Sequence, residues 1–162
     1  MITGIDPQPT VIAFCTIKDQ DIFECKEIRL KKKSAFKNAQ DWQIYLYKAV
    51  KEVFEFIDDK SPIFIEQQRG RINSILEQTI LIESLSRKRA TRVLHPLTWK
   101  RLTNTKCMKD HTLNKREAER KVLHRLREFE RKKGLSESKV PHNMCDAILI
   151  AEAGKEFLSR SS

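Results

Sequence analysis

The stretch P-I-F-I-E-Q-Q-R-G-R, Pro62–Arg71, decides our interpretation of the fold. Its apolar residues after the proline predict a short buried strand, and Glu66 stands at the carboxyl end of that strand. The carboxyl ends of strands are where α/β folds build their sites. A lone carboxylate followed at once by Arg69 and Arg71 therefore predicts a site in which an acid and cations meet.

Two other acids stand in similar positions, one early and one late in the chain. Ile2–Asp6 is a β-prone run that ends in Asp6, and Asp146 opens an apolar helical stretch. Carboxylates gathered from distant segments are the hard oxygen ligands of Mg²⁺ and Mn²⁺. We predict a centre of two such ions, bridged by Asp6 and flanked by Glu66 and Asp146. A helix cap or a surface salt bridge is the alternative for each acid taken singly, and a cap is the simpler role for Asp146 alone.

The hydrophobic pattern predicts an α/β fold with a mixed sheet and helices on both faces. The predicted elements are, in order, strands Ile2–Asp6, Thr10–Ile17 and Asp21–Leu30, helix Asp41–Asp58, strand Ile63–Glu66, helix Arg71–Ser86, strand Thr91–Leu94, and helices Lys115–Lys132 and His142–Leu158. The first strands form an antiparallel meander, and the later strands are parallel because helices connect them. No linker rich in Pro, Gly or Ser divides the chain, so we expect one domain over residues 1–162.

The positive charge of the chain is concentrated in one segment. The formal net charge is +10, and Arg87–Lys133 holds 17 Lys and Arg against 5 Asp and Glu, a local +12 that leaves the remainder at −2. Clustered cations favour a polyanion, because a nucleic-acid backbone releases counterions when it binds them. The alternative is a solvated, lysine-rich helix. The nearness of this basic region to the predicted site favours nucleic acid.

The remaining composition excludes several classes of protein. Neither C-x-x-C pairing nor zinc-ligand spacing is present, so we expect reduced thiols at Cys15, Cys25, Cys107 and Cys145. No run of about 18 apolar residues is available to span a membrane. Asp6 lies too close to Met1 for a targeting peptide before the first strand. We therefore expect a soluble intracellular protein.

Three motifs resemble the RuvC-type branch of the ribonuclease H-like superfamily, over a span from Ile2 to about Gly154. They are G-I-D-P at Gly4–Pro7, I-E-Q-Q-R at Ile65–Arg69 and C-D-A-I-L-I-A-E-A-G at Cys145–Gly154. The glutamate motif looks closer to the fungal mitochondrial and poxviral resolvases, which place arginine or glutamine after this glutamate. The resemblance implies a ribonuclease H-like fold and a magnesium-dependent crossover junction endodeoxyribonuclease. Such an enzyme resolves four-way Holliday junctions by paired cuts in DNA recombination and repair, as a homodimer, in a bacterial cytoplasm or in a viral or phage factory.

The resemblance also calls for a fourth metal ligand, Asp or His, one helical turn before Asp146. This chain has Asn143 at that position. An amide oxygen carries no charge and would weaken the affinity for the second ion. Either the site tolerates a neutral ligand, with His142 assisting, or the chain carries an inactivating Asp-to-Asn change that traps substrate.

The resemblance also extends to lysine and arginine residues around the acids. Lys115 and Lys100 resemble the lysines that neutralise charge at the scissile phosphate, with Lys109 as an alternative and an ordinary phosphate contact as the competing role. The residues expected to bind nucleic acid are Arg69, Arg71, Lys88, Arg89, Lys109 and Arg116. Bacterial RuvC proteins carry an aromatic residue three positions after the glutamate, where this chain has Arg69. A base-wedging residue would therefore come from elsewhere, such as Phe36.

The predicted helix Arg71–Ser86 is expected to build the dimer interface. Its apolar positions cover more of its circumference than packing on one sheet can use, namely Ile72, Ile75, Leu76, Ile80 and Ile82. Two symmetric cuts require two sites related by a two-fold axis. Two other functions remain open: a ribonuclease H-like nuclease with another nucleic-acid substrate, and a non-catalytic basic nucleic-acid-binding protein.

Overall fold

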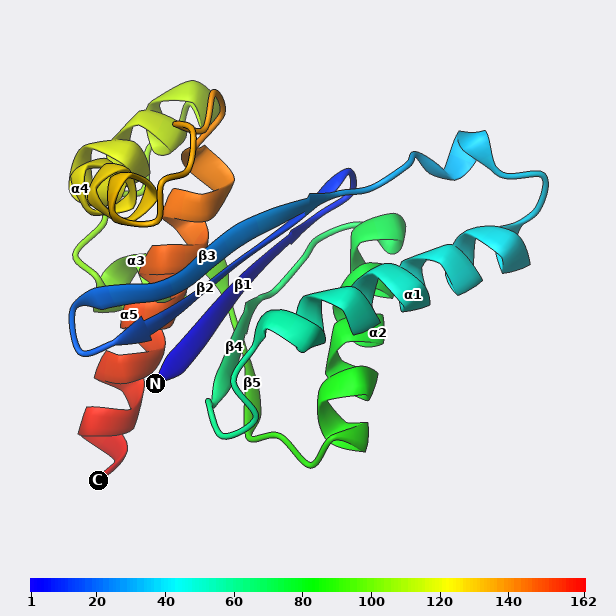
Figure 1. Cartoon of the computed structure of the whole chain (residues 1–162), viewed down its shortest axis with the longest axis horizontal. Helices are drawn as coiled ribbons and strands as arrows, with labels where there is room; N and C mark the ends of the chain where they lie inside the picture. Colours follow the sequence, from blue (N-terminus) through cyan, green and yellow to red (C-terminus); the bar gives the residue numbers. More distant parts are fainter.

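A computed structural model describes the backbone of residues 1–162 and every side chain except that of Ile72. Five strands form one sheet in the order β3-β2-β1-β4-β5 (Figure 1). The strands are β1 (Ile2–Gln8), β2 (Val11–Lys18), β3 (Asp21–Arg29), β4 (Ile63–Glu66) and β5 (Thr91–Leu94). β1, β2 and β3 are antiparallel neighbours, whereas β4 runs parallel to β1 and β5 runs parallel to β4. The predicted mixed sheet is confirmed.

Helices cover both faces of this sheet. α1 (Ala39–Phe56) and α2 (Arg71–Ser86) pack on one face, and α3 (Pro96–Leu102), α4 (His111–Lys132) and α5 (His142–Ser161) pack on the other (Figure 1). A short 3₁₀ turn, Lys33–Ala35, lies between β3 and α1. Alternate strand residues supply the two cores, because successive side chains point to opposite faces. No helix of the described structure combines the length and the apolar character needed to cross a bilayer.

Two helices on the second face differ from expectation. The hydrophobic pattern does not predict α3, because seven residues are too few to show helical periodicity. α4 begins at His111 rather than at Lys115, because Asp110 caps it by accepting a hydrogen bond from the Leu113 amide at 3.0 Å. The buried stripe expected on α4 is confirmed and consists of Ala118, Val122, Leu126 and Phe129.

Helix α5 lies very close to the sheet. A Cβ atom at Gly4 would lie 2.2 Å from the Ala147 carbonyl oxygen and 2.4 Å from the Ala151 amide nitrogen. A Cβ atom at Gly154 would lie 2.3 Å from the Phe64 ring. Both glycines therefore permit a close approach of the helix to β1 and β4. This approach brings the residue next to Ala147, which is Asp146, down onto the strand that carries Asp6.

Four strands end on the same side of the molecule. The antiparallel and parallel pairings make β1, β3, β4 and β5 run in one direction, and they end at Gln8, Arg29, Glu66 and Leu94. We call this side the carboxyl end of the sheet. The β2–β3 turn and the starts of β4 and β5 lie at the opposite end.

Helix α2 orients its apolar residues differently from the prediction. Leu76 is 2% exposed and Ile80 is 0% exposed, and both belong to the core between α2 and the sheet. Ile75 packs partly buried against the same core. The prediction that Leu76 and Ile80 belong to an exposed partner face is therefore wrong, because the sheet covers both. The exposed apolar residues of α2 are instead Ile82 and Leu85, at 64% and 61%. The side chain of Ile72 lies outside the described part of the structure.

Candidate active site

Three acids from three elements meet at the carboxyl end of the sheet. The parallel register pairs Ile5 with Ile65, so the next residues, Asp6 and Glu66, are adjacent on neighbouring strands. Their side chains point to the face covered by α5, opposite to Ile5 and Ile65, which belong to the core under α1 and α2. Asp146 lies in the second turn of α5, the helix that covers this face of the sheet. The structure thus brings together carboxylates that are far apart in the sequence.

The acids disturb one another's protonation. Asp6 is fully buried, and this burial raises its pKa well above the usual value, with further increases from Glu66 and Asp146. Desolvation and then the charge of Glu66 raise the pKa of Asp146 to about 8, although Lys100 and Lys115 oppose the shift. Repulsion of this kind is relieved by a positive charge placed between the carboxylates.

The surroundings of these acids do not fit the alternative roles of a helix cap or a surface salt bridge. α5 begins at His142 after Pro141, so Asp146 lies too far inside the helix to cap it. Among the described side chains, none of the three acids forms an ion pair with a lysine, arginine or histidine. Asp6 cannot form a surface salt bridge because it is 0% exposed. When these carboxyl groups are ionised, no direct ion pair among the described side chains neutralises them.

Neighbouring side chains hold two of the acids in place. The Gln8 amide donates a hydrogen bond to Oδ1 of Asp6 at 2.6 Å. The Trp99 indole donates to Oε1 of Glu66 at 2.8 Å, and the Gln68 amide donates to Oε2 of Glu66 at 3.1 Å. Trp99 is only 1% exposed, so packing fixes its ring and the ring in turn orients the Glu66 carboxylate.

The donor set fits a divalent cation. Oδ2 of Asp6 is buried and has no hydrogen-bond partner among the described atoms, an arrangement that is costly unless a further group satisfies it. Carboxylate and amide oxygens favour Mg²⁺ or Mn²⁺ over zinc. In this conformation, no three His, Cys, Asp or Glu side chains of the described chain form a ready-made metal-binding group. Gln8 holds one oxygen of Asp6 and leaves Oδ2 free, whereas Trp99 and Gln68 each donate to a different oxygen of Glu66.

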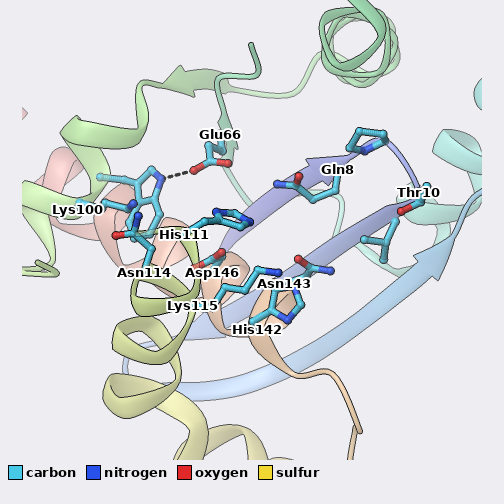
Figure 2. Close-up of a pocket in the computed structure, with 13 residues that line it drawn as sticks. Gln8, Thr10, Glu66, Lys100, His111, Asn114, Lys115, His142, Asn143 and Asp146 are labelled. Atoms are coloured by element: carbon cyan, nitrogen blue, oxygen red, sulfur yellow. Dashed lines mark hydrogen bonds between the residues drawn. The ribbon is translucent and has the colours of Figure 1, made fainter. Parts of the chain in front are cut away.

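A cleft of about 290 Å³ opens over these acids (Figure 2). Glu66 and Asp146 line it, and so do the predicted lysines, Lys100 from α3 and Lys115 from α4. Asn143 lines the same cleft, one helical turn before Asp146. The other lining residues are Gln8, Pro9, Thr10, Val11, Trp99, His111, Asn114 and His142. A phosphate in this cleft would therefore meet both carboxylates and ammonium groups.

Several cleft residues escape sequence-based reasoning. Gln8 follows Asp6 by two positions and so shares its face of β1, which is the only signal that could have found it. His111 and Asn114 enter the cleft because α4 begins earlier than its hydrophobic stripe indicates. The Asn114 side chain also fixes the preceding loop through the amide and carbonyl of Met108, at 2.7 and 2.9 Å. The Asp110 cap is the signal that would have placed both residues.

Four of the predicted phosphate-binding cations lie near the cleft. Arg69 and Arg71 follow β4 at the carboxyl end of the sheet and are exposed. Nη2 of Arg69 lies 3.4 Å from Nε2 of His95, at the end of β5. Lys109 and Arg116 are exposed around the start of α4. None of these four side chains lines the cleft itself, so they stay predicted contacts at its margin.

The other two predicted cations, Lys88 and Arg89, lie at the opposite end of the sheet, just before β5 begins. Arg89 is 7% exposed and donates hydrogen bonds to the backbone carbonyls of Asp58 and Ser61, the latter at 2.7 Å. It also approaches the carboxylate of Asp59 at 3.7 Å. The guanidinium group of Arg89 holds the loop before β4, an arrangement that does not favour the predicted contact with nucleic acid. Lys88 is exposed but distant from the cleft.

Comparisons with known proteins bear on the fold. No protein-family model matches the chain, and no curated protein sequence matches it. Among solved structures, the chain is similar to Thermus thermophilus RuvC, with a TM-score of 0.66 and 15% identity over 99% of this chain and 96% of that chain. It is also similar to T. thermophilus RuvC in complex with a Holliday junction substrate, with a TM-score of 0.62 and 14% identity over 98% of this chain and 94% of that chain. The chain therefore has the RuvC-type, ribonuclease H-like α/β fold.

Proposed function

We propose that this chain is a divalent-cation-dependent endonuclease that resolves four-way DNA junctions by paired cuts. The observation that carries this proposal is the meeting of Asp6, Glu66 and Asp146 beneath a cleft that Lys100 and Lys115 line. The RuvC-type fold supports it, and one of the similar structures is a RuvC in complex with a Holliday junction substrate. A closer relation to the fungal mitochondrial and poxviral resolvases stays a prediction from the I-E-Q-Q-R motif.

In this proposal Asp6, Glu66 and Asp146 would hold two Mg²⁺ ions, for which Mn²⁺ could substitute, with Asp6 as the ligand common to both. When bound, the ions supply Lewis-acid stabilisation of charge on the scissile phosphate and lower the pKa of the attacking water. Gln8 would orient Asp6 through Oδ1 and leave Oδ2 free for a cation. Trp99 keeps the Glu66 carboxylate directed at the cleft, which reduces the reorganisation that binding requires.

The lysines of the cleft neutralise charge on the phosphate. Lys100 and Lys115 both lower the pKa of Asp146, so their ammonium groups lie within electrostatic reach of the acids. Positive charge fixed beside the reacting phosphate is the larger part of phosphoryl-transfer catalysis. We assign this role first to Lys115 and then to Lys100. Lys109, the alternative, is exposed and does not line the cleft.

One observation favours a second candidate function. Asn143 lines the cleft at the position where a charged ligand would hold the second ion more tightly. A basic nucleic-acid-binding protein that cuts slowly or not at all is therefore the alternative. His142 stands beside Asn143 in the cleft, and burial together with the charges of Lys115 and His111 lowers the pKa of His142. A neutral imidazole is available there to assist the amide as a ligand.

The test compares substrates and one restoring variant. The chain and its Asn143→Asp variant are incubated in Mg²⁺ with a synthetic four-way junction, a linear duplex of the same sequence and an RNA–DNA hybrid. Paired cuts in opposing strands of the junction support the proposed enzyme, with faster cutting by the variant. Cuts confined to the other substrates contradict junction resolution and support a nuclease of another specificity. Binding without cleavage by either protein supports the non-catalytic alternative.

The proposed enzyme acts as a homodimer. Two symmetric cuts in a nearly two-fold symmetric junction require two sites related by a two-fold axis. This chain provides one cluster of acids at one end of its sheet. Of the apolar residues predicted for the interface, Ile82 is exposed and available to a partner, and Leu85, which was not predicted, is exposed beside it on α2.

A further inference from the structure

We propose that the loop Arg29–Lys37, here called the basic loop, and the groove that leads to it form a second binding track for a nucleic-acid backbone. The basic loop contains Arg29, Lys31, Lys32, Lys33 and Lys37 and no acidic residue, a net charge of +5 in nine residues. The overall charge count hides this cluster, because the chain outside Arg87–Lys133 sums to −2. The inference rests on the proposed function for its ligand class and extends the site to a second region.

A groove connects the candidate active site to the basic loop. A second cavity of about 450 Å³ is lined by Arg29, Lys32, Glu27, Leu30 and Val140, together with four residues that also line the active-site cleft. The shared residues are Thr10, Val11, His142 and Asn143. The cavity over the acids and the cavity beside Arg29 and Lys32 therefore meet across the β1–β2 turn and the start of α5. A strand whose phosphate lies over the acids can continue along this groove.

The fold places the basic loop on the correct side of the molecule. β3 ends at Arg29, at the same carboxyl end of the sheet as Asp6 and Glu66. Figure 1 shows the loop leaving β3 beyond the turn between β1 and β2 and then passing to α1. Arg29 and Glu27 alternate with Ile28, which packs against the core under α1, so they face the side of the sheet that carries α5. The loop and the active site thus share one end and one face.

Contacts with α1 hold the backbone of the basic loop in place while its cations stay exposed. The Lys31 amide donates a hydrogen bond to the Tyr45 hydroxyl at 3.0 Å. The rings of Phe36 and Tyr45 lie 5.0 Å apart, and Nζ of Lys33 lies 5.3 Å from the Trp42 ring. Leu30 is 7% exposed, whereas Arg29, Lys31, Lys32, Lys33 and Lys37 are exposed. A polyanion would therefore meet cations whose ordering cost is partly met before binding.

The density of charge favours a nucleic-acid backbone over other polyanions. The one acid in the groove, Glu27, lies 3.5 Å from Arg29 and leaves the rest of the loop without an acidic partner. Phosphates follow one another at regular short intervals along a nucleic-acid strand, and five clustered cations match such a row. The groove also begins at the site where a phosphate is proposed to be cut. An acidic peptide is the other occupant that the charge permits, and the test below separates the two.

The test removes charge at the groove and, separately, the same charge elsewhere. The variant Arg29→Gln/Lys32→Gln changes the two cations that line the groove. The control Lys18→Gln/Lys60→Gln removes two exposed lysines at the opposite end of the sheet. Each full-length protein is titrated with a fluorescein-labelled duplex and a four-way junction in EDTA, at several salt concentrations. Circular dichroism and thermal melting verify that both variants fold as the wild type does.

The expected result is a change in salt dependence as well as in affinity. Each phosphate contact contributes about 0.9 to the slope of log affinity against log salt, so the groove variant should lose roughly one to two units of slope. The control should change by less than half a unit. A second set of junctions locates the phosphates that contact the groove. Each junction carries one uncharged methylphosphonate, at a different position along the strand. A methylphosphonate beside the cut site should weaken binding by the wild type but not by the groove variant.

The outcomes distinguish this inference from the proposed function. Equal slopes for the groove variant, the control and the wild type overturn the basic loop as a binding track. Competition by poly-glutamate as effective as that by DNA of equal charge overturns nucleic acid as its occupant. A protein that binds with the expected slopes in EDTA but never cuts in Mg²⁺ contradicts the proposed nuclease and leaves the track supported. A chain that binds no nucleic acid contradicts both.

Discussion

At the residue scale, Asp6 is a buried carboxyl group that lowers the stability of the folded chain. A carboxylate that is 0% exposed, with one oxygen lacking a hydrogen-bond partner among the described atoms, destabilises a chain that has nothing bound beside it. Its neighbours Glu66 and Asp146 add repulsion, which raises the pKa of Asp6 further. Residues that reduce stability in this way persist where function needs them. The unfavourable burial of Asp6 therefore favours a cation-binding role for this residue over a structural role.

The first prediction is that Asp6→Asn separates stability from activity. Cleavage of the junction should fall about a thousandfold or more, because several kcal/mol of metal-assisted stabilisation are lost and each 1.36 kcal/mol is a factor of ten in rate. Junction binding should persist or strengthen, since one negative charge near the DNA is removed. The metal-free variant should melt at a higher temperature than the wild type. A variant that cuts at a near wild-type rate would rule out Asp6 as a ligand.

The second prediction concerns pH, through the raised pKa of Asp146. Its carboxyl group titrates at about 8 in the folded chain and at about 3.9 in an unfolded chain, so the folded state holds the proton more tightly. This contribution to stability is complete below about pH 4 and is lost as the pH rises towards 8. In EDTA, the melting temperature should fall between about pH 5 and pH 8, and it should fall less in Asp146→Asn. Parallel curves for the two proteins would contradict the shift.

Sequence patterns locate the acids of this site but not their partners. Asp6, Glu66 and Asp146 each border an apolar run, so the alternation of strands and helices places them at one end of the sheet. Gln8 and Trp99 each contact an acid through one side-chain hydrogen bond, which no sequence pattern predicts. Arg89 shows a different limit, because a charge count cannot distinguish a solvated arginine from one that binds buried backbone carbonyls.

At the scale of elements, the packing of α5 on β1 decides where the site forms. The carbonyl of Ala147 and the amide of Ala151 occupy the space where a side chain at position 4 would lie. Backbone atoms of a helix cannot move aside singly, so any residue larger than glycine displaces α5 as a unit. Because Asp146 is carried by the same helix, displacement would also withdraw it from Asp6 and Glu66.

The third prediction is that Gly4→Ala destabilises the fold and the site together. Overpacking against backbone should cost about 3 kcal/mol, equivalent to a fall of roughly 6–12 °C in melting temperature for a chain of this size. Gly134→Ala is the matched control, since its φ of +66° is strained for alanine but no atom lies within 4 Å of the added Cβ. That variant should cost only about 1–2 kcal/mol and leave cleavage unchanged. Equal losses in the two variants would show that α5 does not depend on close contact at Gly4.

Element boundaries show which signals in the sequence are reliable. Long periodic segments, such as α1 and the α4 stripe, are predicted correctly because many residues share one buried face. α3 is missed because its seven residues give no periodicity, although Pro96 marks its first turn. The face of α2 that meets the sheet is misjudged, because an apolar stripe does not state which of its residues the sheet will cover.

At the scale of the whole molecule, α2 divides its apolar residues between the core and the solvent. Leu76 and Ile80 are buried against the sheet, whereas Ile82 and Leu85 are 64% and 61% exposed. An acid at Ile80 would therefore unfold the chain and say nothing about assembly. The informative positions are those that the fold leaves in solvent. A two-fold interface repeats every contact, so a charge placed near its axis meets its own copy.

The fourth prediction is that Ile82→Asp/Leu85→Asp produces a folded monomer that nicks a junction but does not make both cuts in one encounter. The substitutions replace exposed side chains, so the circular dichroism spectrum and the melting temperature should stay close to those of the wild type. Phe23→Asp is the control, because Phe23 is 52% exposed on β3, away from α2. It should leave the sedimentation coefficient of the dimer unchanged.

Because paired cutting depends on two sites held on one junction, loss of the dimer in the α2 variant should convert linear products into singly nicked ones at equal protein concentration. If the double variant sediments as a folded dimer, the interface lies on another surface and the exposed pair on α2 has a different role.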